Sequence, residues 1–282
     1  MEFEILTANY NNSQFLDSFF NSINNSFVKP KRIIFVDDCS TDNSIEIVSK
    51  FIKEGNVPVK LIENPENMGF ANSLNLAISQ LGSTYFARLD PDDSVFPERF
   101  QAQLLYLERN PDIDLVGTNV QYYLNNLPIR YSDVMYGEFK IKNAIKRGIL
   151  PIIHGTIMGR SEILKNYKYD QNLVPSEDYD LFAYLIFNNF RLENISDPLT
   201  KVTIHSNSVS NDLKYATIKK RYDLAYKYFQ YKKVKIFVFL DFYHLLNYRR
   251  YLFESSVLKY YYLIVAAACM PFKSIKKVLR IS

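Results

Sequence analysis

The stretch RIIFVDDCSTDNSIEIVSKFIK, residues 32–53, decides the fold class of this chain. Its first part is a continuous apolar run that ends in two acids, which is the pattern of a buried parallel strand. From Ser44 onward its apolar residues follow helical spacing, and Ser40, Thr41 and Asp42 are residue types that can cap a helix. A strand followed directly by a helix predicts an α/β fold with a parallel sheet.

The same alternation continues on both sides of this stretch, so we expect a sheet joined by right-handed crossovers. The other predicted elements are strands at 3–9, 59–64 and 85–90 and within 110–124, and helices at 15–23, 71–80 and 100–108 and from Ser176 onward. The stretch between 125 and 175 shows a less regular pattern.

Composition limits the class of protein. The chain has 282 residues, of which 48% are hydrophobic and 15% aromatic, enough for one large domain or two smaller ones. Its two cysteines, Cys39 and Cys269, are far apart, which argues against a disulfide framework or a zinc cluster and fits a reducing compartment. Acids at Glu2 and Glu4 and the lack of a basic leader predict a cytoplasmic protein.

Charge divides the chain into an acidic body and a basic tail. Residues 214–282 hold 15 of the 34 Lys and Arg residues but 3 of the 30 Asp and Glu residues, so their formal charge is +12 and that of residues 1–213 is −8. The tail also holds 17 of the 43 Tyr and Phe residues. Basic and aromatic residues mixed in this way indicate a nucleic acid or a membrane surface as partner.

Polar residues gather at the predicted ends of three strands, TANY (7–10), VDD (36–38) and RLDPDD (88–93). Ligands of open α/β sheets bind at the carboxyl ends of the strands, so these ends are expected to form one site. DPDD has two interpretations, a solvated turn or a site for Mg²⁺ or Mn²⁺, whose preferred ligands are carboxylate oxygens. The acids Glu177 and Asp178 likewise fit simple capping of a helix N-terminus.

Six motifs fall in an order that resembles the family 2 glycosyltransferases, inverting bacterial sugar transferases with a GT-A fold. They are NYNN (9–12), VDDCSTDNS (36–44), NPENMGFANSLN (64–75), DPDD (90–93), SEDYDL (176–181) and IHSNSVS (204–210). The resemblance covers about residues 3–210. It implies a Rossmann-like α/β fold with a mixed sheet flanked by helices, a catalytic domain over 1–213, and a C-terminal helical extension over 214–282.

The resemblance assigns the first three motifs to the nucleotide. It implies that the Ala8 backbone and the Tyr10 ring hold and stack a uracil base, and that Asp38 accepts from the imide N–H of that base. Asn67 and Gly69 match the loop after the third strand, where glycine allows close backbone approach. Asn75 is expected to tie the following helix to the metal loop, although helix packing explains these three residues equally well.

The resemblance also resolves DPDD in favour of a metal site. It implies that Asp92 binds Mn²⁺ or Mg²⁺ directly, that Asp90 supports the metal or the ribose of the donor, and that Asp93 supports the site from just behind the ligands. The metal would bridge the two phosphates of a nucleotide sugar and neutralise the departing diphosphate.

Two histidines match family positions. The resemblance implies that His205 reaches the metal or the diphosphate, although Thr203 stands where the familiar motif has arginine. It places His154 near the donor or acceptor pocket. For both residues the alternative is a histidine that is merely hydrogen-bonded in the fold.

SEDYDL supplies the remaining chemistry in this comparison. An inverting transfer needs one base to take the proton from the acceptor hydroxyl, and the resemblance assigns this role to Asp178, with Glu177 orienting the acceptor or the base.

We therefore expect an inverting, metal-dependent glycosyltransferase that moves galactose or glucose from a UDP-sugar to a hydroxyl of a glycan acceptor, itself lipid-linked. Its pathway would be surface polysaccharide or lipo-oligosaccharide synthesis. One alternative is a non-catalytic nucleotide-sugar-binding or scaffold protein of the same fold. Another is a nucleic-acid-binding protein, although we expect no nucleic-acid partner. A Rossmann dehydrogenase is disfavoured because no G-x-G-x-x-G follows the first strand.

The tail is expected to be helical and amphipathic, and to anchor the enzyme peripherally on the inner face of the plasma membrane. Its longest uncharged run, 260–272, is too short to predict a membrane span. Packing on the catalytic domain, or self-association into a homo-oligomer, is the alternative use of these helices.

Overall fold

The computed structural model describes residues 1–55, 57–205, 214–253 and 256–270. The chain divides into two compact units, residues 1–206 and 207–282. The predicted domain boundary between 213 and 214 falls at the start of a described segment. Two parts of the predictions lie outside the described residues, namely 206–210 of the last motif and 271–282 of the tail.

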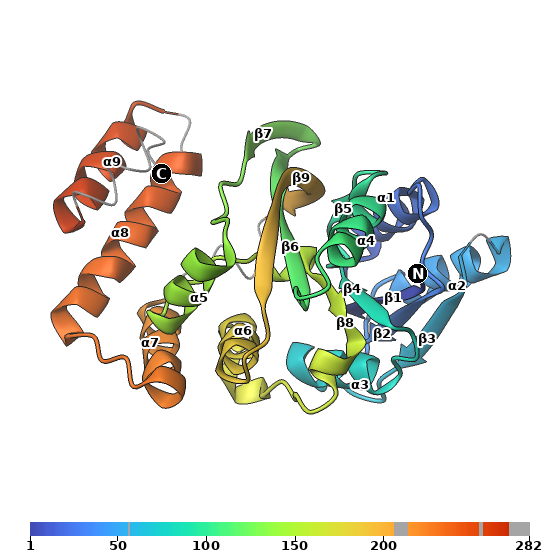
Figure 1. The fold of residues 1–282 in the computed structure, drawn as a ribbon. Helices are drawn as coiled ribbons and strands as arrows, with labels where there is room; N and C mark the ends of the chain where they lie inside the picture. The colour runs from blue at the N-terminus through green and yellow to red at the C-terminus, as the bar shows by residue number, and fades with distance from the viewer. Residues whose placement is uncertain (56, 206–213, 254–255, 271–282) are drawn as a thin grey trace. The chain divides into compact units, whose positions relative to one another are not determined.

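The first unit contains a mixed sheet with helices on its faces (Figure 1). Its strands are β1 (Phe3–Asn9), β2 (Arg32–Asp37), β3 (Val59–Glu63), β4 (Tyr85–Arg88), β5 (Ser94–Val95), β6 (Leu115–Leu124), β7 (Leu127–Tyr131), β8 (Met158–Arg160) and β9 (Leu192–Ile204). Its α-helices are α1 (Ser13–Asn24), α2 (Ser44–Glu54), α3 (Phe70–Ser79), α4 (Arg99–Arg109), α5 (Glu138–Lys146) and α6 (Glu177–Phe187). Three short 3₁₀ helices are η1 (His154–Thr156), η2 (Ser161–Leu164) and η3 (Gln171–Leu173).

The described strands follow the order β3-β2-β1-β4-β8-β6-β9-β5, and β7 pairs with β6. Strands β3, β2, β1 and β4 are parallel, whereas β8 runs antiparallel to both β4 and β6. The parallel part puts the carboxyl ends of β1, β2 and β4 at one edge, where the polar motifs begin. The mixed α/β sheet flanked by helices that the sequence predicts is thus confirmed.

Both faces of β1, β2 and β4 are buried, which explains their continuous apolar runs, whereas β3 at the sheet edge is half-buried. In β2, Ile33 and Phe35 enter the large core cluster formed with α1, α2 and α4, while Ile34 and Val36 lie on the opposite face. Figure 1 shows α1 and α4 on one side of these strands and α3 on the other.

The helix N-termini differ from the prediction in one detail. Asn43, not Ser40 or Thr41, is the residue before α2. Asp42 instead joins two helix starts, because its carboxylate accepts from Ser44 N at 3.0 Å and from Ser13 N of α1 at 2.8 Å. Ser40 donates both its backbone N–H and its hydroxyl to the Asp37 carboxylate and does not cap the helix.

The second unit contains helices α7 (Tyr215–Phe229), α8 (Lys235–Phe253) and α9 (Leu258–Cys269). A small core of Ile218, Tyr222 and Val238 joins α7 to α8, and α8 packs along α9. Within the described residues, no helix is both long and apolar enough to cross a bilayer.

Candidate active site

The ends of β1 and β2 are held together by side chains of the predicted site. Asn9 Nδ2 donates to Asp37 Oδ1 at 2.8 Å, and Asp38 N donates to Asn9 O at 2.8 Å. Asp37 also accepts from Ser40 N at 2.8 Å, so it shapes the turn after β2.

Asp38 organises the loop that follows β3. Its Oδ1 accepts from Asn64 Nδ2 at 2.7 Å and from Met68 N at 2.8 Å, and its Oδ2 accepts from Gly69 N at 2.8 Å. The side chain is buried. Since a carboxylate oxygen has two acceptor directions, the single Gly69 bond recorded at Oδ2 is compatible with a further donor there.

Gly69 is required by its backbone and its surroundings. Its φ is +88°, and a Cβ built on it would lie 2.7 Å from Gln171 Oε1 and closer still to the amide nitrogen. The close approach predicted for this glycine is therefore present, and the neighbour is the Gln171 side chain, whose Oε1 accepts from Ala71 N at 2.9 Å. Gln171 thus caps the start of α3, a role the sequence did not indicate.

The remaining nucleotide-site candidates lie around the same edge. Ala8 pairs with Val36 between β1 and β2, Tyr10 is exposed just after β1, and Asn67 is exposed in the loop before α3. The prediction for Asn75 was wrong. Its side chain exchanges two 2.8 Å hydrogen bonds with the backbone of Tyr169, so it ties α3 to the segment before η3 instead of to the acidic loop.

Arg88 lies at the centre of the site, and sequence reasoning missed it. Its guanidinium forms a two-point ion pair with Asp90, with Nη1 donating to Oδ2 at 2.8 Å and Nη2 to Oδ1. Arg88 is buried, and it also lies over the Phe70 ring at 5.2 Å. The available signal was a charged residue inside an otherwise apolar, buried strand.

The other two acids of DPDD point to different partners. His205 Nε2 lies 2.9 Å from Asp92 Oδ2, and the Phe15 ring packs against the imidazole. Asp93 is buried and accepts from Thr203 N at 3.0 Å. The structure therefore joins Asp92 and His205, which are 113 positions apart in the sequence.

Burial and crowding make the charged forms of Asp92 and Asp93 less favourable than in water, so their pKa values are raised. Burial, and secondarily Asp90, raises the pKa of Asp92, while His205 opposes this shift. Burial, followed by Asp92 and Asp90, raises the pKa of Asp93 well above its usual range. A cation beside these groups would reverse both shifts.

A divalent cation fits this donor set. Across the part of the chain that the structure describes, no group of three His, Cys, Asp or Glu side chains is arranged to hold a metal ion by itself. The neighbouring Asp92 carboxylate and His205 imidazole nevertheless offer an oxygen and a nitrogen ligand, and open positions for phosphate oxygens are typical of nucleotide-bound metals.

Arg99, at the start of α4, links the end of β4 to η1 by hydrogen bonds. It is fully buried, and its Nη2 donates to Arg88 O at 2.7 Å and to Gly155 O at 3.2 Å. Burial lowers the pKa of Arg99 to about 9, while Asp93 opposes this shift. Sequence reasoning began this helix at Phe100 and missed the residue.

Glu177 and Asp178 occupy the first turn of α6. Burial, with Asp178 next, raises the pKa of Glu177 to about 7, and Arg88 opposes this rise. Glu177 Oε2 is buried without a hydrogen-bond partner, whereas Asp178 Oδ1 accepts from Tyr179 N at 2.6 Å. The charge of Asp90 adds to the rise in the pKa of Glu177, which Arg88 opposes.

His154 is hydrogen-bonded in the fold. Its Nε2 lies 2.7 Å from the Tyr169 hydroxyl, and burial together with Arg88 lowers the pKa of His154 well below its usual value. The histidine is therefore neutral at physiological pH. The charge that acts on it belongs to the Arg88 guanidinium, which is paired with Asp90. A contact with donor or acceptor stays a prediction.

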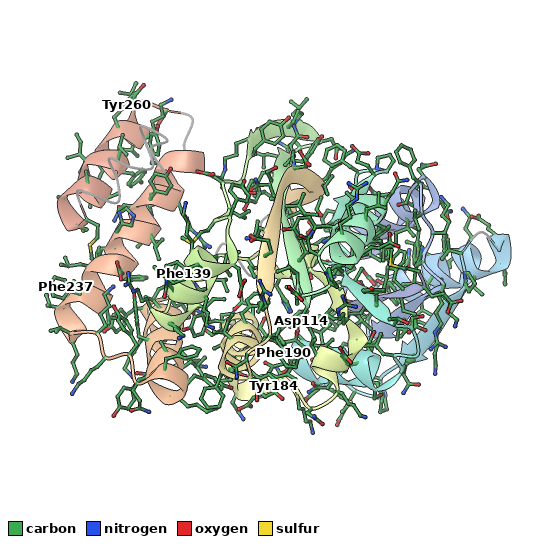
Figure 2. The ribbon with its side chains drawn as sticks, viewed as in Figure 1. Asp114, Phe139, Tyr184, Phe190, Phe237 and Tyr260 are labelled. Carbon is green, nitrogen blue, oxygen red and sulfur yellow. The ribbon has the colours of Figure 1, made fainter. Side chains whose placement is uncertain are left out.

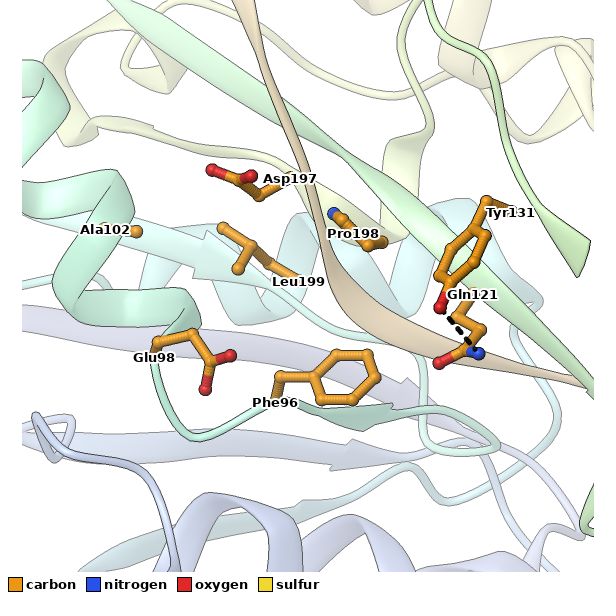
Figure 3. A pocket seen from close by; sticks show the side chains of 8 residues that line it. All are labelled: Phe96, Glu98, Ala102, Gln121, Tyr131, Asp197, Pro198 and Leu199. Carbon is orange, nitrogen blue, oxygen red and sulfur yellow. Dashed lines mark hydrogen bonds between the residues drawn. The ribbon is translucent and has the colours of Figure 1, made fainter. Parts of the chain in front are cut away.

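A cavity of about 360 Å³ lies between α4, β5, β9 and the β6–β7 hairpin (Figure 3). Its lining is mixed, with the Phe96 and Tyr131 rings, the Glu98 and Asp197 carboxylates, and Gln121, which donates to the Tyr131 hydroxyl at 3.2 Å. None of the predicted site residues lines it.

Comparison with known proteins identifies the class. Residues 4–168 match the family model described as "Glycosyl transferase family 2". An uncharacterised glycosyltransferase of Methanocaldococcus jannaschii is 31% identical over 71% of this chain and 70% of its own length. The putative glycosyltransferase EpsE of Bacillus subtilis is 30% identical over 70% of this chain and 71% of its own. The chain thus belongs to glycosyltransferase family 2, and it is a glycosyltransferase.

Solved structures agree on the fold. The S. aureus TarS fragment 1-349, crystallised with UDP-GlcNAc, superposes with a TM-score of 0.62 at 18% identity, over 96% of this chain and 72% of that one. The mannosyltransferase PcManGT from Pyrobaculum calidifontis, solved with GDP-Man and Mn²⁺, gives 0.60 at 16% identity, over 97% and 75%. The GT-A fold expected from the sequence is confirmed.

Proposed function

We propose that this enzyme transfers galactose or glucose from a UDP-sugar, with inversion and with the help of Mn²⁺ or Mg²⁺, to a hydroxyl of a lipid-linked glycan. The observations that carry the proposal are the Arg88–Asp90 ion pair and the Asp92–His205 contact, which organise DPDD. The charges of Arg88 and Asp90 also act on the pKa of Glu177. Surface polysaccharide or lipo-oligosaccharide synthesis is supported by relatives whose names include amylovoran and O-antigen biosynthesis.

The donor end of the site is the edge formed by β1 and β2. The Ala8 backbone and the Tyr10 ring would contact the base, and the free acceptor direction of Asp38 Oδ2 would meet an imide N–H. The imide N–H of uracil would complete Asp38, and a UDP-sugar is favoured because TarS was solved with UDP-GlcNAc. Asn67 and Gly69 would contribute the backbone of the neighbouring loop.

The diphosphate would lie at the acidic loop. Asp92 and His205 would hold the cation, and when bound the cation neutralises the charge that develops on the leaving diphosphate. Asp90, fixed by Arg88, would orient the ribose or support the cation, and Asp93 holds the loop to β9 through Thr203 N.

Asp178 would act as the base. Its carboxylate takes the proton from the acceptor hydroxyl, the oxygen forms a bond to the anomeric carbon, and the bond from that carbon to the diphosphate breaks on the opposite side. Glu177, with a pKa of about 7, is partly protonated at neutral pH and can donate its proton in a hydrogen bond that orients the acceptor. His154, neutral and bound to Tyr169, would line the same pocket.

A panel of UDP, GDP, CMP and dTDP sugars tests the proposal, scored for binding and for metal-dependent hydrolysis. We expect one UDP-hexose to be turned over, Asp92→Asn to lose metal-dependent donor binding, and Asp178→Asn to bind the donor normally but transfer it about 10²–10⁴ times more slowly. Asp17→Asn, an exposed acid on α1, is the matched control.

Transfer that survives in Asp178→Asn would overturn the assignment of the base. Turnover that is insensitive to chelators and to Asp92→Asn would overturn the metal site. If no nucleotide sugar binds, the scaffold alternative becomes the better description.

A further inference from the structure

The second unit reverses the usual polarity of a water-soluble helix pair. Along α8, the residues at a spacing of three that face inward are Val238, Asp241, His244 and Asn247, each between 1 and 5% exposed. Three of these four are polar. A buried seam is ordinarily apolar. Here the small apolar core lies between α7 and α8, and further hydrophobic side chains of α8 and α9 are exposed.

These hydrophobic side chains lie on the outside of the helix pair. Ile236, Phe239 and Tyr243 follow i, i+3, i+7 spacing along one face of α8, and Tyr261 and Ile264 share a face of α9. All five are between 38 and 68% exposed. We call these five residues the outer apolar face. Figure 2 shows two further members of the exposed set, Phe237 and Tyr260, pointing away from the helices.

Most of the polar side chains of the seam are paired within this unit. Asp241 accepts from the Tyr222 hydroxyl and from Lys233 Nζ, and Lys233 also donates to the Tyr222 oxygen at 2.8 Å. His244 Nδ1 lies 3.2 Å from Ala266 O of α9. Polar groups that pair inside a helix bundle while apolar groups face outward are expected where the surroundings are apolar.

The second unit is strongly basic, which indicates that the apolar surroundings also carry negative charge. Its described residues carry eleven lysines and arginines but two acids, Asp223 and Asp241. Both acids are paired with lysines of the same unit. Lys235 and Lys259 lie beside the outer apolar face in sequence, and Lys259 Nζ lies 5.2 Å from the centroid of the Tyr260 ring, a cation–π contact.

We propose that the outer apolar face inserts into the headgroup region of an anionic lipid bilayer, with α8 and α9 lying in the plane of the surface. Tyrosine and phenylalanine suit this interface, and basic side chains are attracted to anionic headgroups. A second copy of the chain would bring the same positive charge against itself. A nucleic acid would match the charge but would leave the isoleucines exposed to water. The proposal goes beyond the transfer reaction and does not rest on it.

Flotation of the full chain with vesicles tests the proposal, comparing pure phosphatidylcholine with an equal mixture of phosphatidylcholine and phosphatidylglycerol. We expect binding to the anionic vesicles to be about tenfold stronger, and to weaken as salt rises. The variant Ile236→Ser/Tyr261→Ser/Ile264→Ser is expected to lose at least about tenfold of this binding, because each substitution removes apolar area that the bilayer would bury.

A matched control uses three equally exposed apolar residues of the first unit, Phe27→Ser/Leu127→Ser/Phe139→Ser, and is expected to bind like the unmodified protein. Lys235→Gln/Lys259→Gln tests the electrostatic part without touching the apolar face, and we expect weaker binding that depends less on salt. Circular dichroism of each variant separates lost binding from lost folding.

The proposal is overturned if the unmodified protein does not float with anionic vesicles, or if the outer-face variant binds as well as the control. A change from dimer to monomer in the outer-face variant, without vesicle binding, would assign the face to a second copy. Tight binding of an oligonucleotide in place of vesicles would assign the charge to nucleic acid.

Discussion

Glu177 carries its carboxyl group in a buried position at the start of α6, next to a second acid. Its pKa of about 7 in the folded protein exceeds the value of 4.5 expected in an unfolded chain. The folded state therefore binds more protons between these two values, so its contribution to stability is present below pH 4.5 and is lost as the pH rises through 7.

Glu177→Gln removes this dependence on pH. We expect the variant to be more stable than the unmodified protein at pH 8, by about 1 to 3 kcal/mol, and to lose that advantage at pH 5. Urea unfolding at the two pH values measures it. Glu66→Gln, an exposed acid in the loop before α3, is expected to show no such change. A difference for Glu177→Gln that is equal at both pH values would contradict the raised pKa.

Substituting alanine at Gly69 and at Gly55 compares two energetic costs, the strain of a positive φ and the collision of the added methyl group with a neighbour. Both have positive φ, but a Cβ at Gly55 meets nothing within 4 Å, whereas one at Gly69 meets the Gln171 amide. We expect Gly55→Ala to lower the free energy of unfolding by about 1 kcal/mol and Gly69→Ala to lower it by about 2 to 3 kcal/mol. Chemical denaturation measures both.

The excess cost at Gly69 should depend on Gln171. In a Gln171→Ala background the Gly69→Ala substitution is expected to cost about as much as Gly55→Ala, because the collision is gone and the strained φ remains. If the cost at Gly69 is the same in both backgrounds, the backbone alone requires the glycine.

The candidate site residues Asp38, Asp92 and Asp178 came from motifs of several residues, and their roles stay predictions. Arg88 and Arg99 were not predicted, because each is a single charge inside an apolar pattern, and its meaning depends on a partner brought close by the fold. Asn75 shows the opposite error. Its motif was noticed, but its partner, the Tyr169 backbone, is 94 positions away and cannot be read from local sequence.

At the scale of elements, the first half of the chain was readable because β1, β2 and β4 are buried on both faces and the helices between them each have an apolar face. The predicted bounds of β1 and β2 agree with the structure to within one residue. Strand β9, thirteen residues long, gave no clear signal. It contains Pro198, and its register with β6 shifts on both sides of Asn119, which breaks the alternation that reveals a strand.

The contact between α7 and α8 depends on a buried ion pair. Asp241 accepts from Lys233 and Tyr222 in a region with few apolar residues. Removing one partner of a buried pair leaves the other charge without compensation, whereas replacing both with apolar residues is often tolerated. We therefore expect Asp241→Leu to destabilise the α7–α8 contact by about 3 kcal/mol, and Lys233→Met/Asp241→Leu to recover most of that loss.

Hydrogen exchange of the α7 and α8 amides measures this effect where it occurs. The exposed pair Lys219–Asp223 is the control, and Asp223→Leu is expected to change exchange rates by an amount equivalent to less than about 0.5 kcal/mol. Equal effects at the two aspartates would show that the buried pair adds nothing beyond a surface pair.

The whole molecule joins an acidic catalytic unit to a basic helical one. Every residue of the large core cluster, from Phe3 to Met158, lies in the first unit, and so do all the proposed site residues. The small cluster of Ile218, Tyr222 and Val238 belongs to the second unit alone. This separation supports the proposal that residues 1–213 form the catalytic domain and residues 214–282 a region with a different task.

A chain ending at residue 213 tests this division. We expect it to fold with a melting temperature within a few degrees of the full chain, because it keeps the large core, and to bind the donor with the same metal dependence. With a formal charge of −8 in place of +4, it should be retained by an anion exchanger at pH 7.5, where the full chain is not. It should no longer float with anionic vesicles. Loss of donor binding in a folded truncated protein would show that the basic helices complete the catalytic site, whereas vesicle binding that persists would place the membrane contact on the acidic unit.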